Sequence, residues 1–338
     1  MKVAIVILNW NTKDYLSRFL PGLLKEADGM GEVIVADSGS DDGSLEMMAE
    51  KFPSVRTIPL GKNYGFTGGY NRALATLDGE GFEYYLLINS DIEVPEGFLE
   101  PLVEWMDSHP ECGACGPKLK SFRDRSSFEY AGAAGGLMDR NGYPFCRGRV
   151  LRKVEKDEGQ YDTPKDVLWV SGACLLTRAS LWKESGGLDD RFFAHFEEID
   201  YCWRLQRAGH KVTVVPRSEV FHIGGGTLPQ DSPRKLKLNY RNNLLAMQNN
   251  LPGTVGRTAA KRTVRRRMIL DGFSALVYLL SLKFDCFKAV YQAHREFRSL
   301  GRWPEESMVS RIKGLCPIDL IPLATFRKRK LFDFLHNF

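Results

Sequence analysis

The chain has 338 residues and a mass of 38.3 kDa, which leaves room for one large domain with an appendage or for two domains. Hydrophobic residues make up 43% and charged residues 26% of the chain, a composition that excludes a disordered or fibrous protein. The formal net charge of +5 is too small to indicate nucleic-acid binding, and no apolar run is long enough for a transmembrane helix.

Strands and helices are expected to alternate through the first third of the chain. Short apolar runs that end in turn residues predict buried parallel strands at 2–8, 32–36, 55–60 and 84–89. Helices are expected between and after them, at 15–27, 44–52, 69–77 and 97–108. This order predicts a doubly wound α/β sheet, in which ligands bind at the carboxyl ends of the strands.

The rest of the chain has two parts. Residues 119–166 are expected to form a hairpin or a flexible loop, and strands and helices then resume at 167–177, 179–185, 198–208 and 211–215. From about residue 227 the sequence becomes helical, basic and aromatic. We therefore expect an α/β domain over 1–227 and a helical extension over 228–338.

The cysteines and the amino terminus favour a cytoplasmic protein. The seven Cys are odd in number, and their spacing does not suggest a disulfide framework. Cys112 and Cys115 form a CxxC without a second pair to complete a zinc site, so we expect buried strand thiols. The apolar run at 3–8 is not followed by a signal-peptide cleavage site.

Polar residues follow the first two strands. Asn9 ends the first strand, and Asp37 ends the second, just before a Ser-, Gly- and Asp-rich turn. A carboxylate at such a strand end can accept hydrogen bonds from ribose hydroxyls or from a base N–H. The alternative is an ordinary strand-to-helix turn with capping residues.

A glycine-rich segment follows the third strand. It contains Asn63, Gly65, Gly69 and Asn71 at the start of a predicted helix. Glycines in this place let backbone N–H groups approach a phosphate, although a tight turn uses the same residues.

The fourth strand ends in Asn89, Ser90 and Asp91, which resembles a motif that holds a divalent cation against a diphosphate. Asp91 is the expected direct ligand. His222, which precedes a run of glycines, is a candidate further ligand or phosphate contact. The alternatives are a capping Asp and a structural His.

Three carboxylates crowd the start of the helix predicted near residue 198, namely Glu197, Glu198 and Asp200. Mutual repulsion and partial burial would raise the pKa of one of them into the range of a general base. The helix N-terminus opposes this effect, and an acidic first turn is also common in helices without catalytic function.

Taken in order, these segments resemble the family 2 glycosyltransferases with the GT-A fold, in the rhamnosyltransferase-like branch. The resemblance covers about residues 1–227 and rests on the segments VAIVILNWN, ADSGSDDGS, NYGFTGGYNRAL, LINSDIEV, WVSGACLLTR, FFAHFEEIDYCWRLQRAG and HIGGG. It implies a GT-A type, mostly parallel sheet with a nucleotide-sugar half at about 1–118 and an acceptor half at about 119–227.

The resemblance also implies roles for single residues. Asp37 would hold the base and ribose of a nucleotide sugar, and Asp91 would bind the metal, with His222 completing the metal or phosphate site. Trp169 and Gly172 would lie near the sugar and the acceptor. The remaining donor-binding positions are Asn9, Asn63, Gly65, Gly69, Asn71, Asn89 and Ser90.

Two positions depart from the family pattern. Glu198 stands where the family usually has an Asp base, so Glu197 and Asp200 stay alternatives for that role. Asn89 replaces the more common acidic residue of the metal motif.

The function implied is an inverting transfer of a sugar from a nucleotide-diphosphate sugar to a hydroxyl of a glycan or lipid-linked acceptor in cell-surface polysaccharide synthesis, with Mn²⁺ or Mg²⁺ as cofactor. One alternative is a non-catalytic nucleotide-sugar-binding scaffold. Another is a different nucleotide-sugar enzyme such as a nucleotidyltransferase. That class usually has a glycine-rich, basic loop after the first strand, where this chain has Asn9-Trp10-Asn11.

The extension suggests a peripheral membrane contact on the cytoplasmic side. A basic cluster at 257–267 precedes the apolar segment 269–282, and a second basic run at 327–330 precedes Leu331, Phe332, Phe334 and Leu335. Basic residues beside an apolar face suit an anionic membrane. The alternative is packing on the catalytic domain or on the second subunit of a homodimer.

Overall fold

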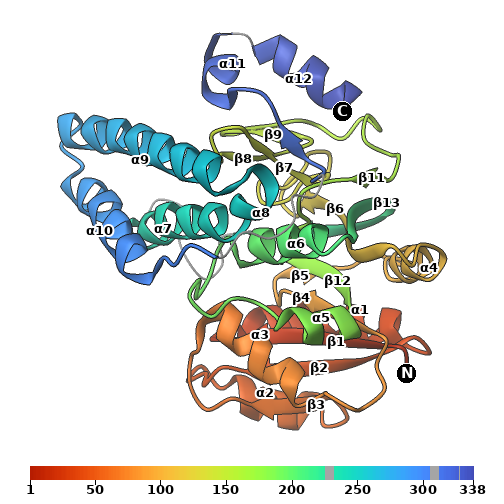
Figure 1. Ribbon diagram of the computed structural model, residues 1–338. Helices are drawn as coiled ribbons and strands as arrows, with labels where there is room; N and C mark the ends of the chain where they lie inside the picture. Colours follow the sequence, from red (N-terminus) through yellow and green to blue (C-terminus); the bar gives the residue numbers. More distant parts are fainter. Residues whose placement is uncertain (225–231, 305–311, 327) are drawn as a thin grey trace.

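The protein is described by a computed structural model that covers residues 1–338 except 225–231, 305–311 and 327 (Figure 1). Within this part of the chain, the main sheet has nine strands in the order β11-β13-β6-β12-β4-β1-β2-β3, with β5 paired to β13. Its strands are β1 (Val3–Asn9), β2 (Gly31–Asp37), β3 (Arg56–Pro59), β4 (Tyr84–Ile88), β5 (Ile92–Glu93), β6 (Cys112–Ser121), β11 (Lys165–Asp166), β12 (Cys174–Arg178) and β13 (Lys211–His222).

Helices cover both faces of this sheet, as expected for a doubly wound fold. They are α1 (Lys13–Ala27), α2 (Ser44–Lys51), α3 (Gly65–Ala75), α4 (Glu100–Ser108), α5 (Ala179–Ser185) and α6 (Glu197–Arg207). Successive residues of β1 point to opposite faces. Val3 and Ile5 share a core with α1, α2 and α4, whereas Ala4 and Val6 share a core with α3, α5 and α6.

The four N-terminal strands are parallel, and their carboxyl ends meet at one edge. Asn9 is the register partner of Asp37, and Ile7 is the partner of Ile88. β12 runs antiparallel between β4 and β6, which makes the sheet mixed but mostly parallel. Cys112 and Cys115 are buried free thiols in β6, as predicted.

Residues 119–166 form more than a hairpin. Strands β7 (Gly136–Asp139), β8 (Pro144–Cys146), β9 (Arg149–Val150) and β10 (Lys153–Val154) make a small antiparallel sheet. A fifth strand, β14 (Leu315–Cys316), comes from the C-terminal region and pairs in parallel with β7. The sequence did not predict this pairing, because β7 and β14 are far apart in the sequence and β14 has only two residues.

The C-terminal part is helical, as expected. It contains α7 (Pro233–Asn250), α8 (Pro252–Val255), α9 (Arg257–Leu280), α10 (Phe284–Leu300), α11 (Leu320–Phe326) and α12 (Lys328–Asn337). Helices α7, α9 and α10 lie together on one side of the sheet (Figure 1). None of the helices in the described residues is long and apolar enough to span a lipid bilayer.

Candidate active site

Asn9 and Asp37 meet where β1 and β2 end. The Nδ2 atom of Asn9 donates to Oδ2 of Asp37 at 2.7 Å, and both residues are buried. The other Asp37 oxygen accepts the backbone N–H groups of Gly39 and Ser40. Asp37 thus stabilises the turn after β2, and its carboxylate lies at the edge of the sheet where β1 and β2 end.

The loop between β3 and α3 packs against a segment more than 120 residues away. Asn63 Oδ1 accepts the N–H of Gly65 at 2.7 Å, and the N–H of Thr67 donates to the carbonyl of Phe193. Gly65 has a φ of +74°, and a Cβ there would lie 2.5 Å from Phe193. Only glycine permits this close approach.

The next turn of α3 also packs closely against neighbouring residues. A Cβ on Gly69 would lie 2.7 Å from the side chain of Leu8. The amide of Asn71 bonds the carbonyl and the N–H of Leu188 and also donates to Asp190. The Asn71 side chain therefore fixes the segment that leads to Phe193.

Asp91 and His222 come together at the end of β4. Strand β5 begins one residue after Asp91 and pairs with the end of β13, so that His222 lies opposite Ile92. The Nε2 atom of His222 is 3.2 Å from Oδ1 of Asp91, and its Nδ1 atom is 3.7 Å from Oε2 of Glu129.

These charges decide the protonation of the cluster. Burial by itself lowers the pKa of His222, but the pairs with Asp91 and Glu129 outweigh it and raise the pKa to about 10. Burial by itself raises the pKa of Asp91, but the hydrogen bond and the charge of His222, together with backbone hydrogen bonds, more than offset it and leave the pKa below its ordinary value. The carboxylate of Asp91 is therefore ionised near neutral pH.

The donor set at this point fits a divalent cation that is completed by other ligands. Without a cation His222 is the protonated partner of Asp91, and a cation would have to displace that proton before the imidazole could bind it. Nδ1 of the buried His222 has no hydrogen-bond partner among the described residues. Within those residues no group of three His, Cys, Asp or Glu forms a complete metal site. Oxygen ligands from a bound phosphate would be needed to fill the coordination shell.

Glu197 and Glu198 begin helix α6 and differ in environment. Burial raises the pKa of Glu198 to about 7. Burial, and then the charge of Glu198, raise the pKa of Glu197 well above its ordinary value. Among the described residues, the Oε2 atom of each has no hydrogen-bond partner.

Asp200 is engaged differently from the two glutamates. It is completely buried, and it accepts hydrogen bonds from Arg204 at 2.8 Å and from the side-chain amides of Asn249 and Asn250. Arg204 also donates to the carbonyls of Ser185 and Gly187. Asp200 thus ties α6 to α7 and to the segment after α5.

The loop before Glu197 is strained and is held from outside. Phe193, His195 and Phe196 all have φ values between 65° and 72°, a conformation that costs free energy in residues other than glycine. The Nδ2 atom of Asn242 in α7 donates to the carbonyls of Phe192, Ala194 and His195. The guanidinium of Arg241, beside it, also donates to the carbonyl of Phe192.

Contacts through the sheet bring the separate segments to one place. A Cβ on Gly172 would lie 3.5 Å from Cβ of Glu198 and 3.3 Å from the Phe66 ring. The next residue, Ala173, accepts the N–H of Asn89, two residues before Asp91. Glu198, Gly172, the end of β4 and the β3–α3 loop therefore adjoin one another.

Trp169, predicted to lie near the sugar and the acceptor, is buried. Its ring covers Gly136 of β7, where a Cβ would lie 1.9 Å away, and its indole N–H points to the carbonyl of Leu137. Ser90, which lies between Asn89 and Asp91 in the sequence, is also buried. The predicted roles of these residues toward ligands stay predictions.

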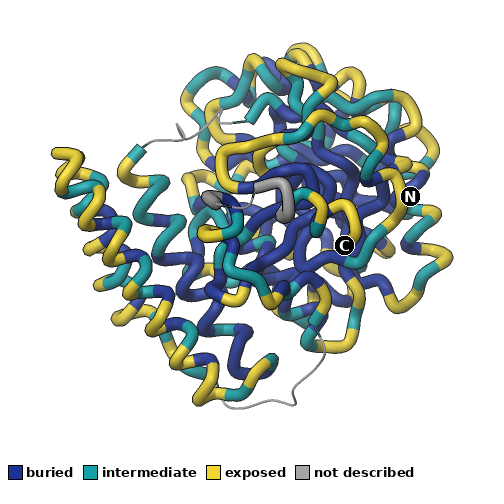
Figure 2. The backbone as a smooth tube through the Cα atoms, turned by 90° about the horizontal axis from the view of Figure 1, so that it is seen from above, coloured by how far each residue is buried: buried dark blue, intermediate teal, exposed yellow. Residues whose placement is uncertain are grey.

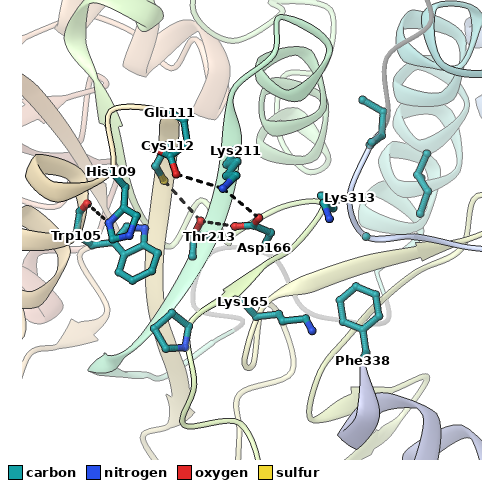
Figure 3. Close-up of a pocket in the computed structure, with 14 residues that line it drawn as sticks. Trp105, His109, Glu111, Cys112, Lys165, Asp166, Lys211, Thr213, Lys313 and Phe338 are labelled. Atoms are coloured by element: carbon teal, nitrogen blue, oxygen red, sulfur yellow. Dashed lines mark hydrogen bonds and ion pairs between the residues drawn. The ribbon is translucent and has the colours of Figure 1, made fainter.

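A separate polar cavity of about 610 Å³ lies at the other edge of the sheet (Figure 3). It is lined by His109 and Cys112 at the start of β6, by Lys211 and Thr213 at the start of β13, and by Asp166 of β11. Because β6 and β13 are parallel and end near His222, this cavity is at their amino ends, at the edge opposite Asp91 and His222.

Sequence reasoning missed Glu129 and Asn242. Glu129 lies in the irregular segment after β6, where no spacing relates it to His222. Arg241 and Asn242 belong to a segment, Tyr240-Arg241-Asn242, that stands out in the sequence but without an evident role. Only the fold shows that it contacts the loop at 192–196. Gly225 and Gly226, which follow His222, lie outside the described residues.

Comparison with known proteins gives a consistent result. The model of the family described as "Glycosyl transferase family 2" matches residues 4–184. An N-acetylglucosaminyl-diphospho-decaprenol L-rhamnosyltransferase of Mycobacterium tuberculosis is 28% identical over 266 residues, which are 74% of this chain and 85% of the relative. The rhamnosyltransferase WbbL of Escherichia coli is 26% identical and aligns over 65% of this chain and 83% of the relative.

Solved structures share the fold. A mannosyltransferase from Pyrobaculum calidifontis, in complex with GDP-Man and Mn²⁺, has a TM-score of 0.54 and 13% sequence identity, covering 89% of this chain and 76% of that one. The enzyme GalNAc-T7, solved with UDP, GalNAc and Mn²⁺, has a TM-score of 0.56 at 14% identity; the match covers 73% of this chain and about half, 47%, of that protein.

Proposed function

Because the chain belongs to glycosyl transferase family 2, and is therefore a nucleotide-sugar glycosyltransferase, we propose that the strand-end edge described above is its active site. The observation that carries this proposal is that the Asp91–His222 pair and Glu198 lie in neighbouring segments, linked through Gly172, Ala173 and Asn89. These residues are spread over more than 130 positions of the sequence, and a purely structural role does not require them to adjoin.

The donor is a nucleotide-diphosphate sugar held along the ends of β1, β2 and β4. Asp37, fixed by Asn9, faces the base and ribose, and the β3–α3 loop with Asn63 and the start of α3 with Gly65 and Gly69 border the donor. The support for this is geometric, because parallel strand ends are the usual place for a nucleotide in α/β folds. Asn71 acts through the segment at 188–190 that it holds.

A divalent cation, Mn²⁺ or Mg²⁺, is held by Asp91 and His222. When bound, it offsets the negative charge of the diphosphate leaving group. Asn89 and Ser90 line the same strand end. The Mn²⁺ present in the structures of both solved relatives supports this assignment.

Glu198 is the general base. It removes the proton from the acceptor hydroxyl while that oxygen attacks the anomeric carbon, and the diphosphate leaves from the opposite side. A single displacement needs one base and inverts the anomeric configuration. A carboxylate with a pKa of about 7, whose Oε2 has no hydrogen-bond partner among the described residues, suits this task. The pKa of Glu197 is raised well above its ordinary value, and Asp200 is engaged by Arg204.

The acceptor is a hydroxyl of a glycan or a lipid-linked glycan, approached past Gly172 and Trp169. The names of the relatives support a deoxyhexosyl donor such as a rhamnose nucleotide, and that of the M. tuberculosis relative supports a polyprenyl-diphosphate acceptor. The process is the synthesis of a cell-wall or O-antigen polysaccharide.

Acceptor-dependent release of nucleoside diphosphate tests the proposal. The purified chain is incubated with dTDP-rhamnose or a UDP-sugar, Mn²⁺ and an N-acetylglucosaminyl-diphospho-lipid. We expect release that requires both substrates, stops in EDTA and returns with Mn²⁺ or Mg²⁺. Full turnover in chelator would contradict the metal assignment. Donor binding without release, under every acceptor tried, would favour a nucleotide-sugar-binding scaffold.

A further inference from the structure

Most large apolar residues of helix α9 face away from the protein core. Its buried stripe is Ala260, Val264, Arg267, Asp271 and Ala275. Arg267 donates to Asp271 at 2.7 Å and to the carbonyl of Gly142 at 2.9 Å. The helix is therefore anchored to the body of the protein by small residues and a buried ion pair.

The opposite face of α9 is apolar and exposed. Ile269, Phe273, Leu276 and Leu280 recur at intervals of three and four residues, and Leu282 and Phe284 continue the surface into the turn and the start of α10. These six side chains, which we call the hairpin tip, are 48–75% exposed. The tip lies at the end of the α9–α10 hairpin that points away from the sheet, at the left of Figures 1 and 2.

Basic residues adjoin the tip on the same helix. Lys261, Arg262 and Arg265 are exposed, and Arg262 falls on the stripe that continues into Ile269 and Phe273. Asp271, the only acid in α9, is buried by Arg267. On α10, the exposed Asp285 stands between the exposed Lys283 and Lys288, so the surface around the tip is net positive.

We propose that the hairpin tip docks on the surface of an anionic lipid bilayer. The apolar side chains enter the boundary between headgroups and acyl chains, and the arginines stay among the phosphates. Along the helix axis, Arg265 is eight residues from Phe273, a distance of about 12 Å at 1.5 Å per residue. That spacing lets the apolar tip enter the interface while the guanidinium groups contact headgroups.

The charge favours a lipid surface over a second copy of the chain. An isologous contact would bring the same basic surface of two subunits together, whereas a leaflet rich in phosphatidylglycerol supplies the opposite charge. The other half of the sequence-based membrane prediction is not supported. Leu335 is buried and Phe332 and Phe334 pack against the core, while the side chains of 325–331 lie outside the described residues.

Vesicle sedimentation of the full chain tests the inference, which goes beyond the proposed transferase activity and needs neither donor nor acceptor. The vesicles are phosphatidylcholine alone, or with roughly a third phosphatidylglycerol. One variant combines Phe273→Ser, Leu276→Gln and Leu280→Gln; another combines Arg262→Gln and Arg265→Gln. The matched control, Leu151→Ser with Val154→Ser, removes exposed apolar side chains from the small sheet instead.

We expect the wild type to sediment with anionic vesicles and to be released by high salt. The tip variant should stay in the supernatant, the arginine variant should bind about thirty-fold more weakly, and the control should behave as the wild type. Wild-type protein that stays in solution with anionic vesicles, or a tip variant that binds as the wild type does, would overturn the proposal. The proposal would also be overturned if the wild type binds no vesicles but is a dimer in light scattering, and if the tip variant is a monomer. The partner of the hairpin tip would then be a second copy of the chain.

Discussion

Glu197, Glu198 and Asp200 are three acids in one helical turn, and the fold gives each a different state. Asp200 is an ionic anchor, with Arg204 and two asparagine amides as partners. Burial, and then the charge of Glu198, raise the pKa of Glu197 well above its ordinary value. Glu198 has a pKa of about 7, and its Oε2 atom has no partner in the described part of the chain, so it can exchange a proton at neutral pH. The distinction comes from burial and partners, which the sequence alone does not supply.

The raised pKa of Glu198 predicts a cost in stability that depends on pH. Between its ordinary value of 4.5 and about 7, the folded state holds the proton more tightly than the unfolded state, so wild-type stability falls as the pH rises through this window. Glu198→Gln lacks the buried charge. Its free energy of unfolding should exceed that of the wild type by up to about 3 kcal/mol at pH 8, at 1.36 kcal/mol per pKa unit, with the excess disappearing near pH 4.5.

Urea unfolding at a series of pH values measures this difference. Glu50→Gln, on the exposed side of α2, is the matched control and should follow the wild type at every pH. A constant difference between Glu198→Gln and the wild type from pH 5 to pH 8 would show that Glu198 titrates normally.

At the scale of elements, α7 supports the loop at 192–196, which precedes the proposed base. The strained segment at 192–196 carries three left-handed residues directly before the two glutamates. Asn242 satisfies three of its carbonyls, and Arg241 contacts the same loop. An element of the C-terminal part thus holds the loop that precedes Glu198, the proposed base.

Asn242→Ala should therefore lower kcat with little change in the KM for the donor. The loop is free to relax without these hydrogen bonds, and a misplacement of the base by about 1 Å can cost 10²-fold in rate. The control is Asn243→Ala, which removes a neighbouring buried amide whose Nδ2 donates instead to Gly142. Steady-state kinetics at a temperature where both variants are folded separate the two effects. An equal loss of kcat in both variants would reduce Asn242 to a general structural residue.

For the whole molecule, the sequence predicted the sheet and its strand-end edge well, because buried parallel strands are continuous apolar runs that end in polar turns. Asn9 and Asp37 pair as that order requires, and Asp91 is joined by His222 through the short β5–β13 pairing. The sequence could not predict features made by distant contacts with little local signal. Examples are the pairing of β14 with β7, Glu129 beside His222, and the contact of Asn242 with the loop at 192–196.

For the C-terminal extension, too, the sequence predicted some features and not others. A basic and apolar composition was evident, but which apolar residues face the core depends on helix rotation. The structure buries Leu335 near the end of α12 and exposes Phe273 and Leu280 on α9. Composition alone suggests membrane contact for both regions and leaves packing on the catalytic domain or a second subunit as the alternative.

The central claim is that one edge of the sheet binds a nucleotide sugar and presents Glu198 as the base for its transfer. The most direct measurement is the donor dissociation constant and the single-turnover rate, determined for the wild type and Glu198→Gln with Mn²⁺ present. We predict an unchanged dissociation constant and a rate lower by about 10²–10⁴-fold, the usual contribution of a general base. A variant that keeps the wild-type rate, or that loses donor binding instead, would contradict this account.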